Sequence, residues 1–152
     1  MLILALDFGA SLGWAVADGP SVIDSGARYL GGDVARSYAA LRLWIAGDIG
    51  ASTARAELIA YEAVPASVHR GGIAAHRWGG FEAIVLAECS ERKIPYLGVP
   101  IQTWKSVAKV RTNSGPVAAL RAAQRRWPDV DFTTPDEAVA RFVAIAAAER
   151  VK

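Results

Sequence analysis

The chain has 152 residues, of which 53% are hydrophobic and 21% are charged, and its formal net charge is +2. These proportions exclude disordered and low-complexity proteins, and a chain of this length can bury about 68–70% of its unfolded surface, so we expect a single domain over residues 1–152. A lone cysteine, Cys89, excludes an intrachain disulfide and a cysteine-based zinc site and favours a reducing compartment such as the bacterial cytoplasm. No apolar run approaches the roughly 18 residues of a membrane span, so we expect no membrane partner.

The charge is distributed unevenly along the chain. Residues 66–127 contain ten basic and three acidic side chains, whereas the two flanking segments together contain seven basic and twelve acidic ones. His69, His76, Trp78 and Trp104 lie within this basic middle, and basic side chains interleaved with aromatic ones are typical of a surface that binds nucleic acid. The same pattern also fits the solvated faces of ordinary helices, so charge alone leaves both interpretations open.

The first part of the chain predicts three strands and a helix. Residues 1–6 are apolar, and residues 14–17 are apolar again after a glycine-containing bend, which predicts two paired strands with Asp7 at the end of the first. The sequence Asp18-Gly19-Pro20-Ser21 is a turn signal, so residues 22–30 are expected to return as a third antiparallel strand. Apolar residues then recur at helical spacing from residue 34 to 45, and Asp33 is a suitable N-cap.

The second part predicts alternating strands and helices. Residues 57–61 form a short apolar run that ends at Glu62, and after a loop the periodicity predicts a helix over 73–92. Residues 94–99 predict a fifth strand, and helices are expected over 102–110 and 116–127. Thr134 is suited to cap a last helix, with Pro135 at its first position and Asp136 in its first turn. Long helices between the later strands predict a mixed α/β sheet covered by helices.

Three carboxylates stand at element ends that such a sheet could bring together, namely Asp7, Glu62 and Asp136. Each has an ordinary explanation when it is taken alone, as a turn residue, a strand terminus or an acid that complements a helix dipole. Burying them together is unfavourable without a counterion, which a divalent cation would supply. Oxygen ligands favour Mg²⁺ or Mn²⁺ over zinc. Two such ions about 3.5–4 Å apart can hydrolyse a phosphodiester with water as the nucleophile.

Five segments resemble, in their order along the chain, the RuvC-like Holliday junction resolvases of the RNase H-like superfamily. They are LALDFGASLGWAVAD, YEAVP, GGFEAIVLAECSERKIPYLGVPIQTWKSVAK, TNSGPVAALRAAQRRW and TPDEAVARFVAIAAAE. The resemblance covers nearly the whole chain, and it is the order and spacing of these short motifs that carry it. It implies an RNase H-like α/β fold, with a mixed five-stranded sheet of three antiparallel strands followed by parallel strands, flanked by helices. The short, alanine-rich, loosely matching motifs favour a phage or prophage member.

The resemblance also implies an activity and a set of ligands. Members are Mg²⁺-dependent, structure-selective endonucleases that cleave branched DNA as homodimers, and the predicted helix over 73–92 resembles their dimer-forming helix. The positions of Asp7, Glu62 and Asp136 match acids that bind the catalytic metal in the family. A second helical acid falls on Val139, which cannot ligate a metal. Glu137 lies about 100° around the helix from Asp136, so it could replace that acid only where the helix start is distorted.

Cationic side chains that contact phosphate are implied in the same way. Lys105 matches a family lysine near the scissile bond, Lys109 lies one turn further on, and Arg121 is the nearest candidate for a second family lysine. The loop after Glu62 is where family members insert a side chain at the junction centre, and the candidates are Val68, His69 and Trp78. The remaining expected contacts to nucleic acid are Arg70, Arg77 and Arg111.

Three other functions stay open at this point. A junction-binding protein whose metal site has decayed at Val139 would have the same basic middle, and only metal-dependent cleavage separates it from a nuclease. A YqgF-like RNA-processing nuclease would have the same fold. Asp7-Phe8-Gly9 with Gly13 also resembles the first phosphate loop of actin-like ATPases, but those proteins need two such domains and usually more than about 300 residues.

Overall fold

The computed structural model describes residues 1–9, 11–47, 56–65 and 71–151. Its strands are β1 (Leu2–Asp7), β2 (Ser11–Asp18), β3 (Ser21–Tyr29), β4 (Leu58–Ala63) and β5 (Tyr96–Pro100). Its helices are α1 (Val34–Ala46), α2 (Gly72–Arg92), α3 (Ile101–Ala108), α4 (Pro116–Arg126) and α5 (Pro135–Arg150). The predicted elements are all present, with ends displaced by a few residues, most clearly at β2, which begins at Ser11 rather than at Trp14.

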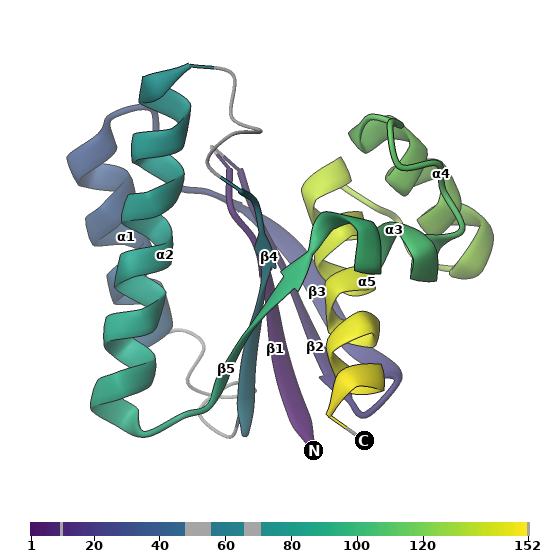
Figure 1. Ribbon diagram of the computed structural model, residues 1–152, viewed down its shortest axis with the longest axis horizontal. Helices are drawn as coiled ribbons and strands as arrows, with labels where there is room; N and C mark the ends of the chain where they lie inside the picture. Colours follow the sequence, from purple (N-terminus) through teal and green to yellow (C-terminus); the bar gives the residue numbers. More distant parts are fainter. Residues whose placement is uncertain (10, 48–55, 66–70, 152) are drawn as a thin grey trace.

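The five strands form one sheet in the order β3-β2-β1-β4-β5. The strand pairs β3–β2 and β2–β1 are antiparallel, whereas β1–β4 and β4–β5 are parallel. Figure 1 shows α1 and α2 on one side of this sheet and α3, α4 and α5 on the other. The predicted α/β fold, a mixed five-stranded sheet flanked by helices, is therefore confirmed.

Two predicted helix caps are also confirmed. The side chain of Asp33 accepts a hydrogen bond of 2.8 Å from the backbone N–H of Arg36 at the start of α1. The Thr134 hydroxyl accepts one of 3.2 Å from the N–H of Glu137, and Pro135 occupies the first position of α5. A side-chain acceptor satisfies a backbone donor that lacks an intrahelical partner, and the proline lacks that donor altogether. The N-terminus of α5 is therefore a regularly capped helix start.

Strand periodicity places the two strand carboxylates on the same face of the sheet. Successive side chains of a strand point to opposite faces. In β1, Ile3 and Ala5 pack in the core shared with α5, and Asp7 continues this series. In β4, Leu58 and Ala60 pack in the same core, and Glu62 continues it. Both carboxylates therefore face the layer that contains α3 and α5.

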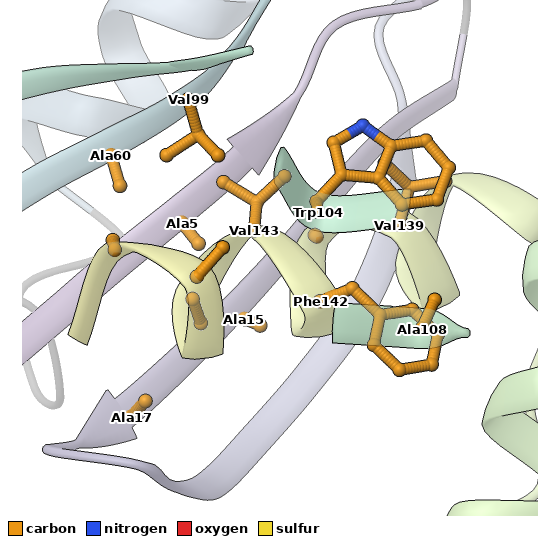
Figure 2. Close-up of a cluster of buried hydrophobic side chains, with 14 of the residues drawn as sticks. Ala5, Ala15, Ala17, Ala60, Val99, Trp104, Ala108, Val139, Phe142 and Val143 are labelled. Atoms are coloured by element: carbon orange, nitrogen blue, oxygen red, sulfur yellow. The ribbon is translucent and has the colours of Figure 1, made fainter. Parts of the chain in front are cut away.

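Small side chains let α5 lie close to the sheet. The core between them contains alanines from β1, β2, β4 and α5, together with a few larger residues. Figure 2 shows part of this core, in which the alanines of the sheet include Ala5, Ala15, Ala17 and Ala60. Gly13 pairs with Asp7 across β1 and β2, and a Cβ atom on Gly13 would collide with the backbone carbonyl oxygen of Asp136. The first turn of α5 therefore lies directly against β2, next to the end of β1.

The opposite face of the sheet carries a larger-residue core. Leu4, Leu6 and Val16 pack there against α1 and α2. Among the described residues, no helix combines the length and the apolar character that crossing a membrane requires.

Candidate active site

Asp7, Glu62 and Asp136 line one pocket, although they come from β1, β4 and α5. The pocket has a volume of about 270 Å³ and lies where the ends of β1 and β4 meet the starts of α3, α4 and α5. Its other lining residues are Ile101, Trp104, Lys105, Ser114, Gly115, Pro116 and Val139. The structure thus brings together the three carboxylates and the lysine that the sequence singled out.

Burial disfavours the charged forms of all three carboxyl groups. Asp7 is 7% exposed and is hydrogen-bonded to Glu62. Burial raises the pKa of Asp7 well above its usual range, and repulsion from Glu62 and Asp136 adds to that rise. Burial also raises the pKa of Asp136. The pocket therefore holds negative charge at a cost that a bound cation would relieve.

Glu62 is held in place by a tryptophan that the sequence did not identify as part of the site. The indole N–H of Trp104 donates a 2.7 Å hydrogen bond to Oε1 of Glu62. Burial raises the pKa of Glu62, whereas this hydrogen bond, a second one with Asp7 and the charge of Lys105 oppose the rise. A buried donor of this kind fixes the orientation of the carboxylate and stabilises its charged form. Since Trp104 is itself 3% exposed, its ring and its N–H are both fixed.

Lys105 reaches the same pocket from α3, one residue further along the chain. Its ammonium donates hydrogen bonds to the carbonyl oxygens of Thr112, at 2.6 Å, and Ser114, at 2.9 Å. It also lies 5.7 Å from the ring of Trp104. Both of these partners are neutral carbonyl oxygens, so an anion that enters the pocket can offer the ammonium a stronger, charge-assisted hydrogen bond.

Glu137 does not join the three carboxylates. It is 3% exposed, and its carboxylate accepts hydrogen bonds from Ser25 and Thr133 instead. This is the outcome expected for a regular helix start, because the 3.6-residue repeat turns Glu137 away from Asp136. Val139 is the residue of α5 that lines the pocket beside Asp136, as the i and i+3 spacing predicts.

The donor set suits a hard cation, although the side chains do not form a finished coordination shell. In the described part of the chain, no group of three or more His, Cys, Asp and Glu side chains is arranged to hold a metal ion as it stands. Asp7 and Glu62 are hydrogen-bonded to each other instead. Burial nevertheless disfavours the charged form of each of the three carboxyl groups. Carboxylate oxygens are also the ligands that Mg²⁺ and Mn²⁺ prefer. The chemistry of the donor set therefore fits such an ion.

The remaining basic candidates lie outside this pocket. Lys109 lines a separate hollow of about 710 Å³ with Arg125 and Arg126, and Arg111 and Arg121 are exposed on the surface. Arg77 is half-buried, donates a 2.6 Å hydrogen bond to the carbonyl oxygen of Gly31, and lines a neighbouring hollow that also reaches Glu62. Three candidates, Val68, His69 and Arg70, lie outside the described residues.

Trp78 packs within an aromatic cluster. Its ring centroid lies 5.8 Å from that of Phe8 and 6.5 Å from that of Tyr61. Trp78 is half-buried, and it lines two hollows beside the loop that follows β4. Its ring therefore packs on the end of the sheet.

Comparisons with known proteins agree on the fold. No protein-family model matches the sequence, and no curated protein resembles it in sequence. RuvC from Thermus thermophilus superposes with a TM-score of 0.74 at 14% identity, over 99% of this chain and 96% of that chain. The same protein in complex with a Holliday junction substrate gives a TM-score of 0.75 at 14% identity, over 99% and 95%.

A third solved structure, the yeast mitochondrial Holliday junction resolvase, has a TM-score of 0.62 at 15% identity and covers 96% of this chain and 77% of that chain. The matches extend over nearly all of this chain, and its sheet has the three antiparallel strands followed by parallel strands that the resemblance implied. The chain therefore has the fold of the RuvC Holliday junction resolvases.

Proposed function

We propose that this protein is a metal-dependent, structure-selective endonuclease that cleaves branched DNA such as a Holliday junction. The observation that carries the proposal is the shared pocket of Asp7, Glu62 and Asp136, with the ammonium of Lys105 at its wall. The fold agrees with it, since one of the similar structures contains a Holliday junction substrate. Phosphodiester hydrolysis at such a pocket needs no covalent nucleophile.

Each residue of the pocket has a defined part in this proposal. Asp7, Glu62 and Asp136 would hold Mg²⁺, which Mn²⁺ could replace. A bound ion supplies activation of water and stabilisation of the leaving oxygen. Trp104 orients Glu62 through the 2.7 Å hydrogen bond. Lys105 would exchange its bonds to neutral carbonyl oxygens for a stronger, charge-assisted bond to an oxygen of the scissile phosphate.

The proposed substrate contacts extend beyond the pocket. Phosphate contacts would dominate affinity for DNA and make it fall with salt concentration. The candidates for these contacts are His69, Arg70, Arg77, Lys105, Lys109, Arg111 and Arg121. A homodimer formed through α2 would present two sites to a two-fold-symmetric four-way junction, and the bacterial cytoplasm is the compartment in which such a substrate would be met.

The test is cleavage of labelled four-way, Y-shaped and linear duplex DNA, and of matched RNA duplexes, in Mg²⁺, Mn²⁺ or EDTA. We expect paired nicks in the four-way junction with either metal, none in EDTA, and little cleavage of the linear duplex. Cleavage restricted to RNA would replace this proposal with an RNA-processing nuclease. Cleavage that persists in EDTA would contradict the metal-dependent mechanism.

Val139 gives a specific reason to test a second function. This side chain is 4% exposed and lines the pocket, so an apolar isopropyl group occupies a position where a fourth carboxylate could otherwise reach the metal. The second candidate is a protein that binds branched DNA without cutting it. The Val139→Asp variant separates the two: cleavage by the variant alone supports the binding protein, whereas cleavage by the unmodified chain shows that three carboxylates suffice.

A further inference from the structure

A buried polar network holds the first turn of α5 on the side that faces β3. Glu137 accepts a 2.6 Å hydrogen bond from the hydroxyl of Ser25 in β3. It also accepts hydrogen bonds from the backbone N–H and the hydroxyl of Thr133, both at 3.1 Å, just before the helix. All of these bonds end on one carboxylate, so both of its oxygens are used within the protein.

Arg141 extends this network one turn further along α5. Its Nε donates a 2.6 Å hydrogen bond to the hydroxyl oxygen of Ser25, which in turn donates to Glu137. Arg141 is 6% exposed, and its guanidinium carbon lies 5.0 Å from the ring centroid of Trp127 and 5.4 Å from that of Phe132. The Ser25 hydroxyl is thus both acceptor and donor, and it bridges a cation and an anion that belong to the same helix.

This arrangement constrains the rotation of α5 about its own axis. Asp136 and Glu137 are adjacent in a regular helix, so their side chains point about 100° apart. Fixing Glu137 towards β3 therefore fixes Asp136 towards the ends of β1 and β4. In the neighbouring strand β2, Gly13 allows the backbone of Asp136 to approach so closely that any Cβ atom there would collide with it. The first turn of α5 is thus held by contacts with two neighbouring strands, β2 and β3.

We propose that Ser25, Glu137 and Arg141 are positioning residues that set the direction of Asp136 for metal binding. This inference rests on the proposed function. Val139 supplies no fourth ligand in the pocket, so each remaining carboxylate carries a larger share of the coordination. Glu137, which lies next to Asp136 in the sequence, thus serves the metal site without binding the metal: its charge is used to orient the neighbouring ligand.

The test compares Mn²⁺ binding, measured by isothermal titration calorimetry, with the midpoint of thermal unfolding. We expect Ser25→Ala to weaken Mn²⁺ binding about tenfold, at the lower end of the effects known for residues that orient metal ligands. Ser25→Thr keeps the hydroxyl and is expected to retain most of the affinity. Glu137→Gln serves as a second variant, because it keeps the shape of the side chain and removes its charge.

A matched control separates positioning from simple stabilisation. Glu88, in α2 on the other side of the sheet, is also buried and forms ion pairs with Arg42, at 3.3 Å, and Arg92, at 3.5 Å. We expect Glu88→Gln to lower the unfolding midpoint without changing Mn²⁺ affinity. Equal changes in Mn²⁺ affinity in Glu88→Gln and Ser25→Ala would overturn the inference.

A double-mutant cycle tests whether the network acts through Asp136. In an Asp136→Asn background, we expect Ser25→Ala to change the remaining Mn²⁺ affinity by less than twofold. The same tenfold loss in both backgrounds, or a Ser25→Ala variant that loses only stability, would overturn the inference and leave the nuclease proposal intact. An unmodified protein that binds no Mn²⁺ would contradict both.

Discussion

Replacing Asp7 with asparagine is expected to make the metal-free protein more stable at pH 8, even though it removes a proposed ligand. The pKa of Asp7 is raised well above its usual range, first by burial and then by Glu62 and Asp136. The folded state therefore binds this proton more tightly than the unfolded state does. Stability from this group is present at low pH and is lost as pH rises through the raised pKa.

The size of the effect follows from the repulsion that is removed. Two unit charges 4 Å apart repel by about 4 kcal/mol at an effective dielectric constant of 20. Because the raised pKa of Asp7 favours its neutral form, which relieves part of this repulsion, we expect Asp7→Asn to raise the free energy of unfolding by about 1–3 kcal/mol at pH 8. An asparagine N–H can donate to Glu62 in place of the proton.

Urea unfolding in EDTA at pH 4.5 and pH 8 measures the difference in the free energy of unfolding between Asp7→Asn and the unmodified chain. The stabilisation is expected at pH 8 and should shrink at pH 4.5, because the raised pKa of Asp7 favours its neutral form at the lower pH. Asp131→Asn, an exposed substitution, is the matched control and is expected to change stability by less than about 0.5 kcal/mol. An Asp7→Asn variant that is less stable than the unmodified chain at pH 8 would refute the electrostatic account of the pocket.

Three further changes test other parts of the site. Trp104→Phe removes the donor to Glu62, so the pKa of Glu62 rises further and the acid limb of the cleavage–pH profile is expected to move to higher pH. Lys105→Ala is expected to slow junction cleavage more than tenfold with an unchanged circular dichroism spectrum, and full activity would remove Lys105 from the site. Gly13→Ala places a methyl group against the carbonyl oxygen of Asp136, so we expect a lower unfolding midpoint and a weaker metal affinity.

The fold was largely predictable because its signals are local. The apolar runs of β1 and β4, the turn at Asp18-Gly19-Pro20-Ser21 and the Thr134-Pro135 helix start each act over a few residues. The three site carboxylates were found for a related reason: each stands at or near the end of an apolar run or at the start of a helix, and parallel strand ends meet at one edge of a sheet.

The contacts that complete the site were not predictable because they join residues far apart in sequence. The bond from Trp104 to Glu62 spans 42 positions, and that from Ser25 to Glu137 spans 112. In the sequence, Trp104 was one aromatic residue in a basic stretch, and Glu137 was a possible ligand next to Asp136. The helical repeat gave the one available signal, since it turned Glu137 away from the pocket.

Cleavage of a labelled four-way junction in Mg²⁺, with the unmodified chain and Asp7→Asn compared at equal concentration, tests the central claim most directly. The three-carboxylate pocket predicts paired nicks by the unmodified chain, which disappear both in EDTA and in Asp7→Asn, while junction binding is retained. Equal cleavage by the two chains would contradict the assignment of this pocket as the catalytic site.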